Sequence, residues 1–222
     1  MKLRIFNGSP RGENSNSSLI IKWLVEGYQQ KEERNQVSTF MLKRVEKHDE
    51  YAELLSKSDC SIIVFPLYVD AMPGIVKAFI EKLEPYKGKM NHLKLGFVVH
   101  SGFPEPHHSR FIEKYLVRLA EILEVNYIGT VVIGGSEGFR IMTEKMLREK
   151  RELLNSLGKS LTSEELFNKE IIKKLAPFEQ MSIAKLTLYR LVSLTGLTNV
   201  YWDRMLKENN VIKDKNNKPY VL

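Results

Sequence analysis

The sequence predicts an α/β fold: a doubly wound, five-stranded parallel sheet with a C-terminal helical extension. Five short apolar runs, rich in β-branched residues, alternate with longer segments whose apolar residues recur at helical spacing. Parallel strands need crossover connections, which are usually helices, so this alternation favours one sheet covered by helices on both faces. No comparable strand signal follows residue 138, where the chain becomes wholly helical in pattern.

The predicted strands end at turn signals, such as Pro66 after the third run and Gly134 after the fifth. We expect the strands at residues 2–6, 37–42, 60–65, 94–100 and 127–133. Helices are expected between them, most clearly over residues 111–123, and then at 139–156, 164–175 and 181–195. Residues 1–135 should therefore form the sheet domain, and residues 136–222 a helical extension packed on the same domain.

The composition is that of an ordinary folded protein, with 222 residues of which 43% are hydrophobic and 27% charged. The apolar runs are too short to span a bilayer, and the first run meets polar residues too early for a signal-peptide core. A single cysteine, Cys60, excludes an intrachain disulfide framework, a four-cysteine zinc site and a cysteine-ligated iron–sulfur cluster. We therefore expect a cytoplasmic protein without a membrane partner, and a structural role for Cys60.

The net charge is +7, and most of the excess lies after residue 135, where 16 Lys and Arg residues face 11 Asp and Glu residues. A basic surface can attract nucleic acid, an anionic membrane or a phosphate-bearing small molecule. Here the basic residues are interspersed with acidic ones, which is typical of a solvated helical surface. We therefore predict no nucleic-acid partner.

The loop after the first predicted strand, residues 7–18, has the composition of a phosphate-binding site. It is rich in small hydroxyl and amide side chains, contains Arg11 and runs into a helix. A helix N-terminus offers unpaired N–H donors to an anion, and an arginine adds a charge-assisted contact. One Ser or Asn would suffice as a helix cap, the alternative role of this cluster. The loop lacks the motifs of triphosphate and dinucleotide sites, so a single phosphate suits it best.

The loop after the third predicted strand should lie at the same edge of the sheet. Residues 66–74 combine prolines with Leu67, Tyr68 and Met72, a composition suited to contact with a flat heteroaromatic ring. A single tyrosine in such a loop is more often structural, so the ring contact depends on the loop as a whole.

The loop after the fourth predicted strand, residues 101–108, contains Gly, Pro and an aromatic residue and ends at His107-His108. Adjacent histidines rarely both ligate one ion, and Glu105 is the only carboxylate nearby in the sequence. We therefore predict no metal site.

Together these segments resemble the flavodoxin-like NADPH-dependent FMN reductases, a family that includes NAD(P)H:quinone oxidoreductases and azo and nitro reductases. The resemblance rests on two motifs, Gly8-Ser9-Pro10-Arg11 with Ser15-Asn16-Ser17, and Pro66-Leu67-Tyr68 with Met72-Pro73-Gly74 and residues 77–82. It covers residues 1 to about 135 in the order that the family's fold requires, and it implies the strand order 2-1-3-4-5.

The resemblance implies FMN as the cofactor and NAD(P)H as the co-substrate. The residues that it assigns to the cofactor are Ser9, Arg11, Asn16, Ser17 and Ser18 at the phosphate, Pro66, Leu67, Tyr68, Val69 and Met72 along the ribityl chain and ring, and Ser101, Gly102 and Phe103 at the other edge of the ring. It further implies a homodimer and a ping-pong hydride transfer to a flavin, quinone or similar small acceptor. Because a flavin carries the difficult chemistry itself, we assign no catalytic acid or base.

Two alternatives stay open from the residues alone, namely a non-enzymatic electron carrier like the flavodoxins and a regulatory protein that has lost the flavin. The basic chain and the Ser-Pro-Arg-Gly loop differ from the acidic proteins and Thr/Gly-rich loops of flavodoxins. The sequence also lacks the Cys-x-x-Cys cluster of relatives that hold an iron–sulfur centre. The role of residues 136–222, as a substrate lid or a subunit contact, is not defined by the resemblance.

Overall fold

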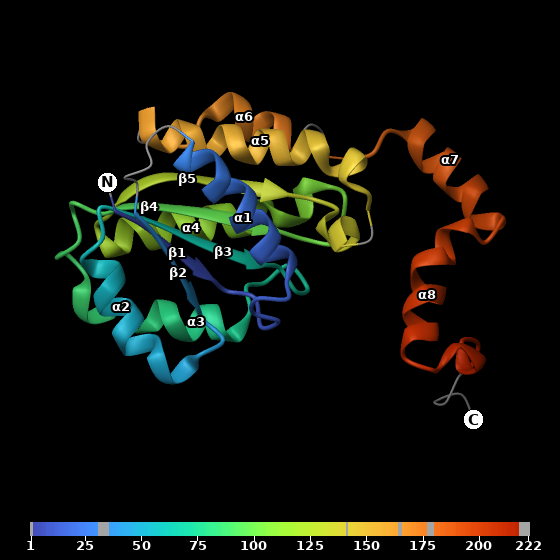
Figure 1. The fold of residues 1–222 in the computed structure, drawn as a ribbon, viewed down its shortest axis with the longest axis horizontal. Helices are drawn as coiled ribbons and strands as arrows, with labels where there is room; N and C mark the ends of the chain where they lie inside the picture. The colour runs from blue at the N-terminus through green and yellow to red at the C-terminus, as the bar shows by residue number, and fades with distance from the viewer. Residues whose placement is uncertain (1, 31–35, 141, 164–165, 177–179, 218–222) are drawn as a thin grey trace. The chain divides into compact units, whose positions relative to one another are not determined.

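The computed structural model describes residues 2–30, 36–140, 142–163, 166–176 and 180–217 (Figure 1). The chain divides into two compact units, Met1–Glu179 and Gln180–Leu222. None of the helices in the described part of the chain is both long and apolar enough to cross a lipid bilayer.

The first unit contains a single five-stranded sheet whose strands are all parallel. The strands are β1 (Leu3–Asn7), β2 (Val37–Met41), β3 (Cys60–Pro66), β4 (Lys94–His100) and β5 (Asn126–Ile133). Their order is β2-β1-β3-β4-β5, which confirms the predicted fold class and strand order. The chain winds from β1 to one edge and then, through β3, to the other, so the order reverses next to β1.

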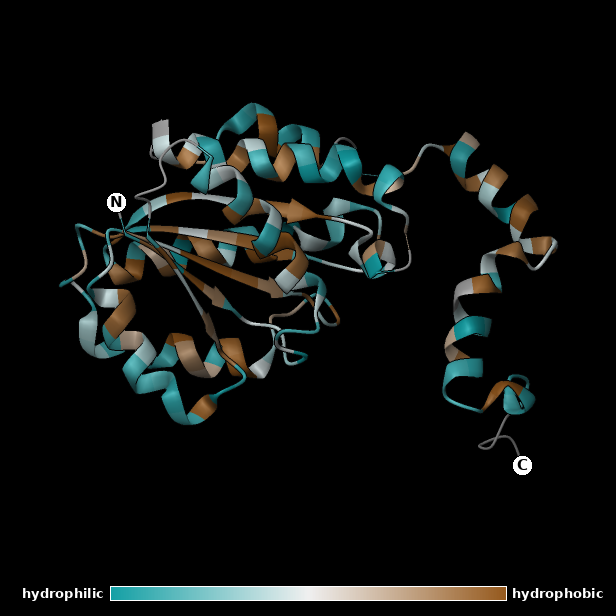
Figure 2. Cartoon of the chain, in the orientation of Figure 1, coloured by the Kyte–Doolittle hydropathy of each residue, from teal (hydrophilic) through white to brown (hydrophobic). Residues whose placement is uncertain are grey.

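Six helices cover the two faces of the sheet (Figure 1). One face packs against α1 (Asn16–Gln29), α5 (Glu144–Ser163) and α6 (Lys169–Leu175), and the other against α2 (His48–Ser56), α3 (Gly74–Glu81) and α4 (Arg110–Leu123). Successive strand residues alternate between the two cores: Ile62 belongs to the first and Ile63 to the second. Figure 2 shows the resulting pattern, with apolar strands between helices that are hydrophilic over much of their surface.

Helices α1 and α5 approach each other unusually closely, at two glycines. A Cβ atom on Gly27 would lie 1.9 Å from the carbonyl oxygen of Asn155, and one on Gly158 would lie 2.1 Å from that of Leu24. The Asn155 amide also donates a hydrogen bond to the Trp23 carbonyl, at 2.9 Å. These contacts hold the second half of α5 against the second half of α1.

The helix predicted at 139–156 begins later and ends later than expected. Residues Ser136–Arg140 form a 3-10 turn, and α5 starts at Glu144. The side chain of Thr143 accepts a hydrogen bond from the Met146 amide at 3.4 Å, which is the contact of a helix cap and sets the boundary.

The remaining helical predictions differ mainly in their boundaries. Of the helix predicted at 164–175, residues 164 and 165 lie outside the described residues, and α6 begins after Asn168, which caps it through the Glu170 and Ile171 amides. The second unit contains α7 (Ile183–Leu194), as predicted, and α8 (Val200–Glu208), which was not predicted. The packing of residues 180–222 on the sheet domain stays a prediction.

Candidate functional site

Loops from four strands meet at the carboxyl edge of the sheet, next to the point where the strand order reverses. They enclose a cavity of about 250 Å³. The lining residues follow β1, β3, β4 and β5 in turn and are Ser9, Arg11, Ser15, Asn16, Pro66, Leu67, Tyr68, His100, Ser101, Gly102, Ser136 and Glu137. Open α/β sheets bind their ligands at this place.

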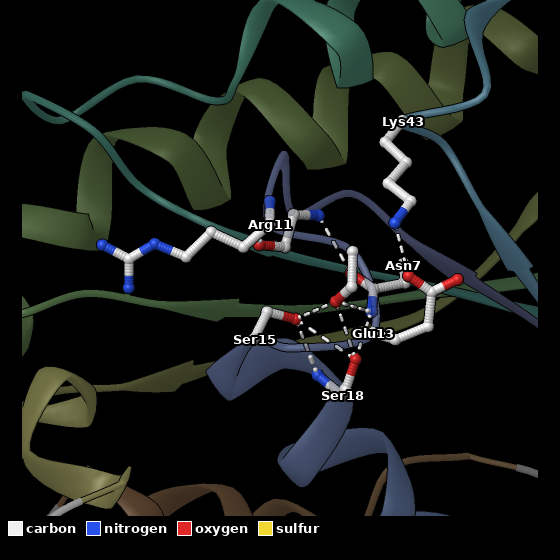
Figure 3. Close-up of polar contacts among 8 residues, drawn as sticks. Asn7, Arg11, Glu13, Ser15, Ser18 and Lys43 are labelled. Carbon is white, nitrogen blue, oxygen red and sulfur yellow. Dashed lines mark hydrogen bonds and ion pairs between the residues drawn. The ribbon is translucent and has the colours of Figure 1, made fainter.

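The loop between β1 and α1 is braced from inside by Asn7, the last residue of β1 (Figure 3). The Asn7 side-chain oxygen accepts a hydrogen bond from the Ser9 amide at 2.9 Å, and its amide group donates to the Ser18 hydroxyl at 2.9 Å. Ser18 in turn donates to the Gly12 carbonyl at 2.9 Å, and Gly12 adopts a φ of 60°, which favours glycine. Hydrogen bonds among the loop's own polar groups therefore stabilise its curved conformation.

Helix α1 begins beside the cavity, because its cap Ser15 and its first residue Asn16 both line it. The Ser15 hydroxyl accepts a hydrogen bond from the Ser18 amide at 3.2 Å, so the capping role considered from the sequence is real. Capping is compatible with the predicted binding role, since the N-terminus of the 14-residue helix still directs its positive dipole end at the cavity.

Asn16 carries a polar atom that the protein leaves unsatisfied. Its side-chain oxygen is buried and has no hydrogen-bond partner among the described residues. Buried polar atoms are almost always paired, and the oxygen and nitrogen of an asparagine amide can exchange places by a flip. A ligand oxygen in the cavity would satisfy the flipped amide.

Arg11 lies at the rim of the cavity. Its guanidinium is 3.7 Å from the Glu137 carboxylate, and both side chains are about half exposed, at 55% and 46%. In Figure 3 the Arg11 side chain extends away from Ser15 and Ser18. An anion in the cavity would compete with Glu137 for this cation.

His100 connects three of the loops beneath the cavity. Its Nε2 lies 2.7 Å from the Ser17 hydroxyl, and its Nδ1 lies 2.8 Å from the Ser136 hydroxyl. Ser136 donates to the Ser101 carbonyl at 3.0 Å, so Nδ1–H donates to Ser136 and the unprotonated Nε2 accepts from Ser17. Burial lowers the pKa of His100 to about 3, and the imidazole is neutral at pH 7.

The structure brings eight of the predicted cofactor residues together around the cavity: Ser9, Arg11, Asn16, Pro66, Leu67, Tyr68, Ser101 and Gly102. The other five lie outside its lining. The Ser17 hydroxyl is hydrogen-bonded to His100, and the Ser18 hydroxyl donates to the Gly12 carbonyl within the loop. Val69 is 94% exposed, Met72 packs against the core beneath α3, and the Phe103 ring lies 4.8 Å from the His108 ring. Cofactor contact by any of the thirteen stays a prediction.

Several residues that shape the site were given no role from the sequence, namely Asn7, His100, Ser136 and Glu137. The only available signal was position, since Asn7 and His100 each end a strand directly before a predicted loop. Glu105, His107 and His108 do lie together, with ligand atoms within 4.8 Å of one another. The rings of the two histidines face each other at 3.9 Å, and the predicted absence of a metal stays a prediction.

The fold and the cavity define an open α/β protein with a cavity at the topological switch point. The sequence matches the family described as having a flavodoxin-like fold over residues 1–157, and the chain belongs to this family. No curated protein matches the chain.

Solved structures with the same fold include several reductases at low sequence identity. An FMN-dependent NADH-azoreductase from Bacillus anthracis, solved with FMN, is 14% identical with a TM-score of 0.58 and covers 73% of this chain and 100% of its own. An NAD(P)H:quinone oxidoreductase from Methanothermobacter marburgensis is 14% identical with a TM-score of 0.59, and the match covers 73% of this chain and 97% of the oxidoreductase. An NADPH-quinone reductase from P. pentosaceus is 17% identical with a TM-score of 0.55, and the match covers 73% of this chain and 98% of the reductase.

Proposed function

We propose that this protein is an FMN-dependent NAD(P)H oxidoreductase that passes electrons to a flavin, quinone or similar small acceptor. The observation that carries the proposal is the cavity at the switch point, where a helix N-terminus and an unsatisfied Asn16 amide face loops with apolar side chains. The three similar reductases with this fold support it.

The residues present fit FMN at both of its ends. Ser9, Asn16 and the first turn of α1 offer donors of the kind that bind one phosphate, with Arg11 at the rim. Pro66, Leu67 and Tyr68 would hold the ribityl chain and the ring. FMN bound there would supply hydride chemistry between NAD(P)H and the acceptor, and we expect ping-pong kinetics.

The protein's own contribution is to bind and orient. Neutral His100 adds no charge beneath the cavity and fixes Ser17, Ser136 and the strand end that leads to Ser101. Tyr68 and Phe103 are 47% and 55% exposed, so a ring placed between their loops has an open side for a planar co-substrate. A homodimer, in which a second chain completes this open side, belongs to the proposal.

An absorbance scan of the purified protein tests the assignment. We expect flavin bands, anaerobic bleaching by NADH or NADPH, and recovery when a quinone is added. A colourless protein that binds no added FMN at micromolar concentration would overturn the proposal. A protein that holds FMN but is not bleached by either nucleotide would be an electron carrier instead.

A further inference from the structure

A second and larger cavity, of about 900 Å³, lies on the other side of the first loop. Its walls are the loop before α1, the first turns of α1, the 3-10 turn at 136–140 and the first turns of α5. It shares only Ser15 with the first cavity. Along the 3-10 turn, Ser136 and Glu137 face the first cavity, whereas Phe139 and Arg140 face the second. The proposed cofactor therefore accounts for none of this space.

The rim of the second cavity is strongly basic. Five cations line it, Lys22, Arg140, Lys145, Arg148 and Arg151, against two carboxylates, Glu13 and Glu144. Glu13 forms an ion pair with Lys43, and Arg151 lies 3.0 Å from Glu26, so these two groups are neutralised by residues outside the cavity.

Lys22, Lys145 and Arg148 have no ion-pair partner among the described residues. Arg140 donates one hydrogen bond to the Asn14 carbonyl at 2.8 Å and keeps further N–H groups for a ligand. Cations that converge on one concave surface raise its potential and favour an anion of more than one charge.

The cavity also has an apolar floor. Trp23 and Phe139 form its buried part, at 5% and 2% exposed, with their rings 5.9 Å apart. Leu19, Met142 and Leu147 surround them. A ligand that fills this cavity should therefore join an apolar body, such as a ring, to an anionic group, because such a molecule matches both floor and rim.

We propose that this cavity binds a nucleotide, with its heteroaromatic ring on the Trp23–Phe139 floor and its phosphate at Lys145 and Arg148. The volume is in the range of small-molecule sites, roughly 300–1,000 Å³. The same chemistry is offered by a free mononucleotide and by the adenylate part of a dinucleotide. The inference does not depend on the proposed flavin, since the two cavities have separate linings.

Calorimetric titration of the full chain, saturated with FMN, tests the proposal with AMP, NAD⁺ and inorganic phosphate as probes. We expect AMP to bind, and inorganic phosphate to bind at least tenfold more weakly because it lacks the ring. Displacement of AMP by NAD⁺ would identify the dinucleotide as the source, and binding of AMP alone would identify the free nucleotide. Absence of binding by both nucleotides would overturn the proposal, as would equal affinity for phosphate.

Charge variants locate the site. Lys145→Ala/Arg148→Ala should weaken AMP binding at least tenfold. Lys87→Ala/Lys169→Ala removes the same charge at two exposed lysines outside the cavity and should change the affinity less than twofold. Equal losses in both double variants would show a nonspecific charge effect and overturn the assignment. FMN affinity should be unchanged in both, so failure of the flavin assignment and failure of this one are separable.

Tryptophan fluorescence gives a second readout. Trp23 and Trp202 are the only tryptophans in the chain, so Trp202→Phe leaves Trp23 as the sole reporter. AMP should quench this emission with the same midpoint as the calorimetric titration. Emission that does not change while AMP binds would place the nucleotide away from the Trp23–Phe139 floor.

Discussion

The imidazole of His100 joins groups that are distant in sequence into one buried hydrogen-bonded chain. Ser17 is 83 residues away from it and Ser136 is 36 residues away. Because both ring nitrogens are occupied in a single tautomer, a proton added to Nε2 would force the Ser17 hydroxyl to turn and accept, and would place a charge where there is no solvent. Acid should therefore disturb the start of α1 as well as the core.

The pH dependence of stability follows from this burial. Folding lowers the pKa of His100 from 6.5 to about 3, so the unfolded chain binds the proton more strongly. Above pH 6.5 the neutral His100 makes its full contribution to the free energy of unfolding. As the pH falls from 6.5 toward 3, the free energy of unfolding decreases by up to about 1.4 kcal/mol per pH unit. Urea unfolding at several pH values should show this slope in the native protein and its reduction in His100→Gln.

The control for this titration is His92→Gln, which removes an exposed histidine. It should leave the slope between pH 3 and 6.5 as in the native protein. If His100→Gln and the native protein lose stability in parallel over that range, the neutral buried imidazole is not the cause.

Arg11 is the residue whose charge should matter most for the proposed phosphate. Arg11→Ala removes one charge-assisted contact, and we expect FMN affinity to fall roughly 10-fold, because the side chain is half exposed and screened. Lys43→Ala removes a cation that pairs with Glu13 outside the first cavity and should change the affinity by less than about threefold. Quenching of flavin fluorescence measures both.

Riboflavin separates the phosphate contact from a general loss of structure. Its affinity should be the same in the native protein and in Arg11→Ala, since riboflavin has no phosphate. An equal loss for FMN and riboflavin would show that Arg11 acts on the loop and not on the phosphate.

At the scale of elements, the contact between α1 and α5 depends on two glycines that the sequence pattern does not explain. A glycine inside a helix usually costs about 1 kcal/mol relative to alanine. At Gly158 we expect glycine to be more stable than alanine, because a Cβ would meet the Leu24 carbonyl oxygen at 2.1 Å and the Tyr28 amide nitrogen at 2.8 Å. Backbone atoms of a packed helix cannot move aside as a side chain can, so the two helices would have to separate.

We expect Gly158→Ala to destabilise the protein by about 1–3 kcal/mol, the usual cost of overpacking. Gly74→Ala is the matched control, since a Cβ there has nothing within 4 Å. It should be neutral or stabilising by up to about 1 kcal/mol. Chemical denaturation of the three proteins measures both differences, and a stable Gly158→Ala variant would show that α5 does not pack on α1 at this distance.

The strands could be predicted closely because β1, β3 and β4 are buried almost throughout and turn residues follow most of the apolar runs. The run predicted at 94–100 matches β4 at every residue, the run predicted at 2–6 is shifted by one residue at both ends, and the other three differ by one residue at one end. Helix boundaries were less predictable, since α5 starts where Thr143 caps it and not where the apolar spacing begins. A helix boundary that is set by one side-chain hydrogen bond cannot be predicted from the spacing of apolar residues.

At the scale of the whole molecule, the sequence located the binding edge but not its construction. Loops 7–18, 66–74 and 101–108 were chosen because they follow strands, and the cavity lies between them. The bracing of the first loop by Asn7, the contact of Ser17 with His100 and the second cavity depend on residues brought together only by folding. The composition of loop 7–18 could suggest a phosphate site. The presence of two separate cavities could not be predicted, because it depends on how the 3-10 turn at 136–140 folds between them.

Both cavities and both apolar cores lie within the unit Met1–Glu179, so this unit should fold and bind FMN by itself. We expect a chain ending at residue 179 to unfold in one cooperative transition by circular dichroism. Its FMN affinity should be within about twofold of the full chain, since none of the twelve residues around the first cavity is removed. A truncated chain that folds but loses FMN would mean that residues 180–222 complete the cofactor site. One that fails to fold would contradict this expectation and would mean that residues 180–222 stabilise the sheet domain.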